Sequence, residues 1–423
     1  MDLRTRRPRR HAGDEGCARS VGTPQSGQDL PAGRTDPAEA DRAQRSGQRG
    51  SLVVTVDGLK PKAVEKPKTV EELAGCLSEA SRTGQAVIPI GGGRALGMGD
   101  PPARFDLALV TTGLDRIVEV SPEDLTATVQ AGVTLEALQA ELGKARQFLP
   151  LDPFASPGHT IGGLLATAWS GPLRQRYGTP REFLVGLQVA LPDGRLARSG
   201  GKVVKNVSGY DLNKLHFGAL GSLGVITEAS FKVFPRPLFE ETVEASEPQL
   251  TDAWREARRA LDLKLPPVAL ELVREPDRHR LVARFAGSED GVRRMVRELV
   301  WAPVGEADFW QQHSRRRAGR WLRVAVPPEA LRDVLQSLPE AASWWAHPGV
   351  GVVHWVDFES AQVAAVRAAA EDAGGSAVLL AAPSALKREL GAWGRQPATI
   401  DLMRRVKRAF DPAGTLSPGR YLV

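Results

Sequence analysis

The feature that most constrains this chain is a run of three glycines directly after a short apolar segment. Ala86–Ile90 is predicted to be a strand, and Gly91-Gly92-Gly93 follows it without a break. Glycine reaches positive φ at little steric cost, so such a loop can present successive backbone N–H groups to a pyrophosphate. It lacks the Gly-Lys-Ser/Thr of a Walker loop, and Leu96 stands where a Rossmann loop has its third glycine. Alone, the loop is equally consistent with a hairpin turn.

Two later glycine-rich segments favour the binding interpretation. The segment Asp152–Gly163 combines small residues, a hydroxyl group and the pair Gly162-Gly163, and the segment Gly218–Thr227 contains three more glycines. Three separated loops of this kind suit a long ligand that is held along its length. His159 lies inside the second loop, where it either assists the ligand or is an ordinary loop residue. His216, just before the third loop, is expected to be structural.

Helix and strand patterns place these loops in an α+β framework. Thr69 and Glu72 have capping-box spacing for a helix, and Thr134 is expected to cap a second helix. Further strands are predicted at 107–110, 117–120, 126–131, 183–191 and 225–234, and beyond residue 238 helices are predicted at 250–261, 362–373 and 400–410 and strands at 281–285 and 350–358. The expected organisation is a tail over 1–50, a two-part domain over 51–237 (51–150 and 151–237), an α+β cap over 238–385 and a C-terminal segment over 386–423.

Composition excludes several other classes of protein. The net charge is +6, but much of the excess lies in the Arg-rich first fifty residues, and no aromatic residues are interleaved with the remaining basic ones, which argues against a nucleic-acid groove. No apolar run reaches membrane-spanning length, so a membrane association would be peripheral at most. The two cysteines, Cys17 and Cys76, form no metal motif or disulfide framework, which fits a reducing cytoplasm. The tail is predicted to be disordered.

The order of these motifs resembles the FAD-binding domain of the vanillyl-alcohol oxidase (p-cresol methylhydroxylase, PCMH) family. Further segments are similar to the FAD-binding subunits of bacterial glycolate oxidases (glycolate dehydrogenases). They are Ser170-Gly171-Pro172-Leu173-Arg174, Lys205-Asn206-Val207-Ser208-Gly209-Tyr210-Asp211-Leu212, Trp393-Gly394 and the closing stretch Phe410–Arg420. The resemblance covers residues 51–423. It implies a two-lobed PCMH-type domain, a cap, and a C-terminal helix that returns to the flavin.

The resemblance also implies which residues hold the cofactor. Ile90, Gly91, Gly92, Gly93, Arg94, Ala95 and Leu96 would hold the pyrophosphate; Asp152, Thr160, Ile161, Gly162 and Gly163 would line the isoalloxazine and ribityl side; and Gly224 and Ile226 would contact the flavin or adenine. FAD is expected to be non-covalent, because Arg94 stands where tethering relatives have a histidine in this loop. Ser417 stands where the family usually has asparagine.

The substrate side of the resemblance is incomplete. Related 2-hydroxy-acid dehydrogenases bind a divalent metal through a His-x-Gly-x-Gly-Asn-x-His segment and a later Glu-His pair. Here His347 and His354 remain with both glycines, but Val352 replaces the asparagine, and Leu380-Ala381 occupy the places of the Glu-His pair. No metal is therefore expected, and His354 is interpreted as a core histidine in a strand. No catalytic residue is assigned. Arg174, Arg176 and Arg181 either attract an anion or are solvated.

These observations predict an FAD-dependent oxidoreductase subunit acting on the CH–OH group of 2-hydroxy acids. By the resemblance it would belong to a cytoplasmic glycolate oxidase complex, peripheral to the inner membrane at most. Its partners would be a homologous flavoprotein and an iron–sulfur subunit, because this chain has no cysteine cluster. Two alternatives remain: a self-sufficient FAD dehydrogenase of another hydroxy acid or alcohol, and a flavin-bound scaffold without catalysis.

Overall fold

The computed structural model describes residues 54–201, 211–305 and 308–423, and every contact reported below lies within the unit Leu52–Val423. The predicted tail over residues 1–50 and residues 205–210 of the quoted motif lie outside the described part of the chain. None of the described helices is both long enough and apolar enough to cross a membrane.

The first glycine loop begins at the end of a small parallel sheet with the order β1 (Ala63–Glu65), β3 (Leu107–Val110), β2 (Val87–Ile90). All four residues of β3 are buried, as are three of the four in β2. Helix α2 (Val70–Arg82) packs its apolar face, with Leu73 and Leu77, into the same core. Strand β2 is thus packed on both faces. This packing holds the first residue of the glycine loop in place.

The capping prediction for α2 is half correct. The Thr69 hydroxyl accepts a hydrogen bond from the Glu72 N–H at 3.1 Å, as expected of an N-cap residue. The Glu72 carboxylate, however, accepts from the N–H of Lys68 at 2.7 Å and not from that of Thr69. The reciprocal bond of a capping box is therefore shifted one residue outward.

A five-stranded antiparallel sheet forms the second part of the domain. Its order is β4 (Ile117–Ser121), β5 (Thr126–Gln130), β9 (Val225–Lys232), β7 (Leu184–Ala190), β8 (Leu196–Gly200). Because β9 pairs with both β5 and β7, strands from before and after residue 150 share one sheet, so the expected division at residue 150 does not follow the sheets. Helices α3 (Leu135–Lys144) and α4 (Ile161–Thr167) lie beside it, each capped by a threonine, Thr134 or Thr160.

Short elements connect these parts. They are η1 (Thr111–Gly113), β6 (Gln147–Phe148), α5 (Arg174–Tyr177), α6 (Pro180–Phe183), α7 (Asn213–His216) and β10 (Phe234–Pro235).

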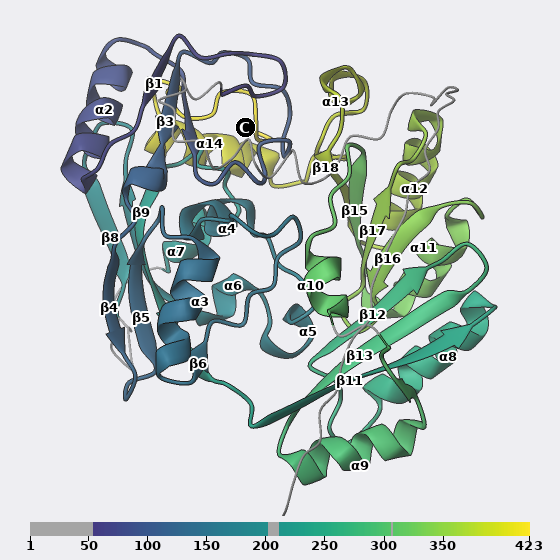
Figure 1. The fold of residues 1–423 in the computed structure, drawn as a ribbon. Helices are drawn as coiled ribbons and strands as arrows, with labels where there is room; N and C mark the ends of the chain where they lie inside the picture. The colour runs from purple at the N-terminus through teal and green to yellow at the C-terminus, as the bar shows by residue number, and fades with distance from the viewer. Residues whose placement is uncertain (1–53, 202–210, 306–307) are drawn as a thin grey trace, which may run out of the picture. The chain divides into compact units, whose positions relative to one another are not determined.

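The cap is built on an eight-stranded antiparallel sheet. Its order is β14 (Ala302–Pro303), β11 (Phe239–Glu247), β13 (His279–Gly287), β12 (Ala269–Arg274), β16 (Ser343–His347), β17 (Val352–Val356), β15 (Trp321–Ala325), β18 (Ser376–Ala381). Helices α8 (Leu250–Leu261), α9 (Glu289–Leu299), α11 (Leu331–Ser337) and α12 (Ser360–Asp372) cover one face, while α10 (Phe309–Ser314) lies on the other (Figure 1). The remaining elements are η2 (Pro328–Ala330), α13 (Ser384–Leu390) and α14 (Ile400–Phe410).

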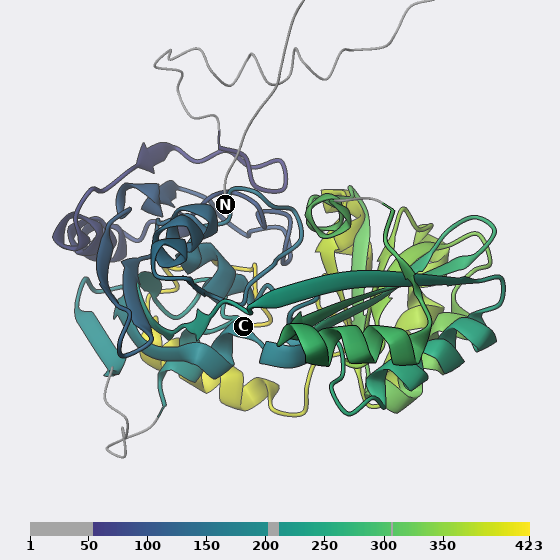
Figure 2. The ribbon, with the colours of Figure 1, turned by 60° about the horizontal axis from the view of Figure 1, so that its bottom comes forward.

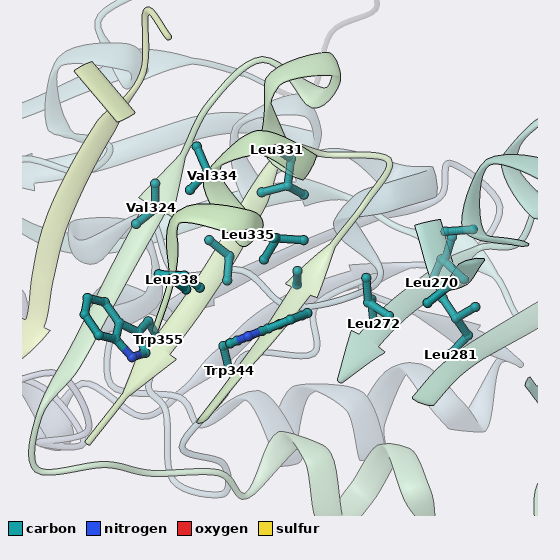
Figure 3. Packing of buried hydrophobic residues seen from close by; sticks show 14 of the residues in the cluster. Leu270, Leu272, Leu281, Val324, Leu331, Val334, Leu335, Leu338, Trp344 and Trp355 are labelled. Atoms are coloured by element: carbon teal, nitrogen blue, oxygen red, sulfur yellow. The ribbon is translucent and has the colours of Figure 1, made fainter. Parts of the chain in front are cut away.

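The side chains of the cap strands point alternately to the two faces of the sheet and so belong to two separate cores. Leu270, Leu272, Val324, Trp344 and Trp355 face the helices and belong to the same buried core as the apolar side chains of α11 (Figure 3). The residues between them in sequence face the other way, because successive side chains of a strand point to opposite faces. That inner face carries Glu271, Trp321, Arg323, Trp345, His347, His354 and Leu380.

The second glycine segment docks on this inner face through Phe154. The Phe154 ring lies 5.1–6.0 Å from the rings of His354, His313, Trp345, His347 and Trp321. One fully buried phenylalanine therefore fixes the loop against the cap.

The C-terminal segment returns to the N-terminal sheet. Leu416 pairs alongside Val87, whose N–H donates to the Thr415 carbonyl and whose carbonyl accepts from the Ser417 N–H, both at 2.8 Å. The Lys407 ammonium anchors the segment by donating to Asp411 Oδ2 at 2.6 Å and to the Leu416 carbonyl at 2.9 Å. Figure 2 shows this yellow segment in the same lobe as the purple and blue N-terminal elements. The predicted α+β fold, with a C-terminal helix leading back to the first domain, is confirmed.

We expect Leu416→Ala to lower the free energy of unfolding by about 2–4 kcal/mol, because Leu416 is fully buried and truncation leaves a cavity. Leu402, which is 51% exposed on α14, supplies the matched control, and Leu402→Ala should change stability by less than about 0.5 kcal/mol. Urea denaturation measures both. Equal effects of the two substitutions would contradict the anchoring of the C-terminal segment.

Candidate functional site

The site is organised by direct contact between the first two glycine loops. A side chain at Gly91 would place its Cβ 2.1 Å from Thr160 Oγ1, and one at Gly92 would place it 1.9 Å from the Gly158 carbonyl oxygen. Glycine is thus required at both positions by the close approach. The Thr160 hydroxyl accepts from the N–H groups of Gly92 and Gly163, each at 3.3 Å, and so ties the two loops together.

Two adjoining hollows run along these loops. Both are lined by Pro89, Ile90, Gly91, Gly163, Ala166 and Leu220. The first continues along Gly92 to Leu96 and reaches His159, Thr167 and Arg420; the second continues to Thr111, Gly162, Gly221, Val225 and Ile226. The structure thus brings together most of the cofactor residues expected from the sequence: Ile90, Gly91, Gly92, Gly93, Arg94, Ala95, Leu96, Thr160, Gly162, Gly163 and Ile226.

Three expected cofactor residues do not line either hollow. The Asp152 carboxylate accepts from Leu173 N–H at 3.0 Å, and burial raises its pKa to about 8, although nearby Arg284 opposes the shift. Ile161 is buried in the core as the first residue of α4. Gly224 lies against His216, and a Cβ added to this glycine would lie 3.2 Å from the imidazole ring. Their positions fit roles in holding the loops.

The C-terminal segment closes the first hollow with Arg420. Its guanidinium donates to the carbonyl oxygens of Leu96, at 2.9 Å, and Met98, at 2.5 Å, so it fixes the end of the first glycine loop. Its Nη1 is buried and has no hydrogen-bond partner among the described residues. An unmatched donor at the edge of a hollow suits an anionic group. Ser417 Oγ donates to the Leu220 carbonyl at 3.1 Å, so this residue supports the third loop.

Two histidines near the loops are held neutral. Burial lowers the pKa of both His159 and His216 to about 4. His159 Nε2 lies 2.7 Å from the Phe154 carbonyl oxygen, which requires a proton on that nitrogen. His159 lines the first hollow, whereas His216 packs against the Phe410 ring of α14. The expectation that His216 is a structural residue agrees with this packing.

A separate pocket lies between the loop after α4 and the inner face of the cap. It is lined by Trp169, Ser170, Gly171, Arg174, Arg323, His347, Val352, His354 and Leu380. Behind it, the buried Glu271 carboxylate lies 2.5 Å from His347 Nδ1 and 3.1 Å from His313 Nε2. His354 is buried, in agreement with its interpretation as a core histidine.

Sequence reasoning missed Glu271, His313 and Arg323. They come from three elements whose adjacency depends on strand order, so no local motif contains them. The signal that could have found them was the placement of single charged residues, Glu271 and Arg323, between apolar neighbours in β-type segments. In the described part of the chain no group of three or more His, Cys, Asp or Glu side chains is arranged to hold a metal ion.

Comparison with known proteins agrees with this geometry. The family model "FAD binding domain" matches residues 61–200, and "FAD linked oxidases, C-terminal domain" matches residues 384–421. The glycolate oxidase subunit GlcE of Escherichia coli (strain K12) is 31% identical over 315 residues, which cover 72% of this chain and 84% of that protein. The chain belongs to the FAD-linked oxidase family. The expected cofactor, FAD, and the expected PCMH-type fold are confirmed.

Other relatives match in different proportions. The glycolate oxidase subunit GlcD of Bacillus subtilis (strain 168) is 35% identical over 54% of this chain, and the match spans only 49% of that protein. A D-lactate dehydrogenase of Archaeoglobus fulgidus is 26% identical over 86% of this chain and 93% of its own length. The solved structure of an alkyldihydroxyacetonephosphate synthase superposes with a TM-score of 0.63 at 18% identity, covering 85% of this chain and 77% of that one, which indicates a shared fold.

The residues along the hollows fit FAD. The pyrophosphate would be received by the two glycine loops in contact, by a capping hydroxyl and by the unmatched Arg420 donor. A planar ring would contact the apolar side chains of Leu220, Val225 and Ile226. When bound, FAD accepts a hydride from a substrate. The protein residues contribute binding, orientation and exclusion of water.

We expect Gly92→Ala to reduce the ratio of bound FAD to protein at least several-fold, because the added Cβ collides with the Gly158 carbonyl and must separate the two loops. The control is Gly75→Ala on α2, where no atom lies within 4 Å of the new Cβ and helix propensity favours alanine. The visible absorbance of the flavin, divided by the ultraviolet absorbance of the protein, measures the ratio. Retention of full flavin by Gly92→Ala would contradict the loop contact.

The neutral histidines predict a loss of stability in acid. Their folded-state pKa of about 4 lies below the ordinary 6.5, so the unfolded chain binds protons that the folded chain excludes. The stability from these groups is complete above pH 6.5 and is lost as the pH falls toward 4. We expect the free energy of unfolding of His216→Gln to fall less steeply across this window than that of the unsubstituted chain. If the free energies of unfolding of the two proteins fell in parallel with pH, the prediction would be contradicted.

Proposed function

We propose that this chain is the FAD-binding subunit of a glycolate oxidase (glycolate dehydrogenase) complex. It would take part in oxidising glycolate, or a closely related 2-hydroxy acid, to the corresponding 2-oxo acid, and pass the electrons from FAD to a partner subunit. The one observation that carries the proposal is the junction of the flavin hollow with a polar pocket of the cap.

Two segments join the hollow to the cap pocket. Helix α4 lines the hollow with Ala166 and Thr167, and the next residues, Trp169 to Gly171, line the cap pocket. On the cap side, Leu380 of β18 lines the same pocket, while its carbonyl oxygen lies 3.6 Å from the Cβ position of Gly97, just after the first glycine loop. A small substrate in the cap pocket would therefore lie next to the cofactor.

The non-covalent state of FAD is part of the proposal. Arg94 lines the first hollow where a tethering histidine would stand, and Cys76 is a residue of α2 that lines neither hollow. Burial and the nearby carboxylates of Glu65 and Glu72 raise the pKa of the Cys76 thiol, which disfavours the reactive thiolate. The proposed cofactor residues would therefore act by non-covalent contact.

Partner subunits are proposed from the chemistry and from the names of the relatives. With two cysteines, the chain cannot supply the four thiolates that an iron–sulfur cluster usually requires. In the proposed complex, electrons that leave FAD in single steps would pass to a cluster on another chain, and a homologous flavoprotein of the GlcD type would complete the assembly. A cytoplasmic location, with contact to the inner membrane through partners at most, fits this proposal.

The experiment is anaerobic flavin reduction. We expect the purified chain to be yellow and to release FAD on acid or heat denaturation, and the reconstituted complex to lose flavin absorbance on addition of glycolate. The control is the same titration with acetate, which lacks the hydroxyl group that is oxidised. A colourless chain that does not take up added FAD, or a reconstituted complex that glycolate does not reduce, would contradict the proposal.

A self-sufficient dehydrogenase is the second candidate, and the polar cap pocket of this chain favours it. Reduction of the flavin of the isolated chain by glycolate or D-lactate, at a rate that partners do not raise, would select it over the subunit.

A further inference from the structure

The cap pocket has an unusual balance of charge. Two arginines, Arg174 from α5 and Arg323 from β15, line it together with two histidines, His347 and His354, and no carboxylate is among the described residues that line it. The buried acid Glu271 lies behind His347 and is already engaged with His347 and His313. Asp152 lies behind Gly171; it accepts from Leu173 N–H at 3.0 Å, and burial raises its pKa to about 8, so it supplies no full negative charge at neutral pH. Two cations that are shielded from solvent and have no local anion are unfavourable.

Arg323 is the less satisfied of the two arginines. It lies on the inner face of the cap sheet, opposite His354 of β17 and Val378 of β18, and no described carboxylate forms an ion pair with it. Its Nε is shielded from solvent and has no hydrogen-bond partner within the described ranges. Burial, and then the neighbouring charge of Arg174, lower the pKa of Arg323 to about 10, so it still carries its charge at neutral pH.

Arg174 likewise forms no ion pair with a carboxylate of the described residues. Burial lowers its pKa, and the carboxylate of Glu182, which opposes that shift, is engaged by the Thr179 hydroxyl. By contrast, its neighbour Arg176 on the same helix is exposed and does not line the pocket. The two arginines therefore line one small space together without a carboxylate partner, and guanidinium groups are the donors that bind carboxylates.

The hydrogen bonding of His354 argues against a metal in this pocket. Trp321 Nε1, which can only donate, lies 3.0 Å from His354 Nδ1, so Nδ1 is the acceptor. Burial, with the nearby cationic groups, lowers the pKa of His354 well below its usual value, so the ring is neutral and its single proton lies on Nε2. A protonated Nε2 donates a hydrogen bond and cannot ligate a metal.

His347 supplies the complementary acceptor. Its Nδ1 faces the Glu271 carboxylate at 2.5 Å, an arrangement in which Nδ1 carries a proton. The Glu271 carboxylate is held in turn by His313 Nε2, and His313 Nδ1 accepts from Arg316 Nε at 2.9 Å. With the Nδ1 proton directed at Glu271, the other ring nitrogen, Nε2, is the atom left to receive a hydrogen bond from a hydroxyl group.

We propose that Arg174 and Arg323 bind the carboxylate of a small organic acid in the cap pocket without a metal ion, with His354 as a further donor and His347 as the acceptor for an adjacent hydroxyl group. The proposal rests on the proposed function in taking this acid to be the substrate, and it assigns the carboxylate end to the two arginines.

The test is calorimetric titration of the flavin-loaded chain with oxalate, a two-carbon acid that the flavin cannot oxidise by removing a hydride, in chelator-containing buffer. We expect saturable binding in the absence of divalent metal. Arg323→Gln and Arg174→Gln should each weaken it by about tenfold or more, since each removes a charge-assisted hydrogen-bonding partner. Arg176→Gln, two residues from Arg174 and exposed, is the matched control and should bind oxalate normally.

Three readouts distinguish loss of the carboxylate site from loss of flavin, from unfolding and from metal binding. Flavin absorbance reports whether a variant still holds FAD, so a loss of oxalate binding with full flavin supports the site even if glycolate never reduces the chain. Thermal unfolding of Arg323→Gln without oxalate should be unchanged or shifted upward, because an unpaired buried charge is removed. Oxalate binding that requires added Mn²⁺ or Mg²⁺, that inorganic phosphate matches in affinity, or that survives both arginine substitutions would overturn the proposal.

Discussion

The contact of the first two glycine loops at Thr160 is the constraint on which the rest of the site depends. Gly91 and Gly92 leave no room for a side chain, and the Thr160 hydroxyl accepts hydrogen bonds from the backbone N–H groups of Gly92 and Gly163. Both loops adjoin buried supports, β2 and the capped end of α4. The hollows that fit FAD therefore follow from this contact between the two loops.

The C-terminal segment and the cap complete this frame from opposite sides. Arg420 fixes the carbonyl groups of Leu96 and Met98, and Phe154 fixes the second loop against the inner face of the cap sheet. The cap sheet can carry polar groups on that face because its helices and the aliphatic core occupy the other. In this way a single period-2 pattern separates the residues that stabilise the cap from those that line its pocket.

The sequence alone predicted the flavin site better than it predicted the cap pocket. The flavin loops were predictable because their glycines, Thr160 and Ile226 lie in short ordered motifs whose chemistry is local. Asp152 shows the limit of that reasoning: its carboxylate satisfies Leu173 N–H and lies outside the hollows, which depends on how the chain turns after the loop. The expected division of the domain near residue 150 departs from the sheets for a similar reason, because the pairing of β5 with β9 is non-local.

The sequence by itself determined the cofactor class and the α+β fold, since the glycine motifs and the apolar periodicities that predict them lie in short stretches of contiguous residues. Tertiary structure alone decided that Arg323 of β15 stands opposite His354 of β17, that Glu271 of β12 reaches His347, and that Arg174 faces them from the first domain. Strand order and domain packing set these distances. Residues that are far apart in sequence come close only when the chain folds, so no local motif predicts their contact. The physical character of the cap pocket, cationic and rich in N–H donors, is therefore a property of the fold.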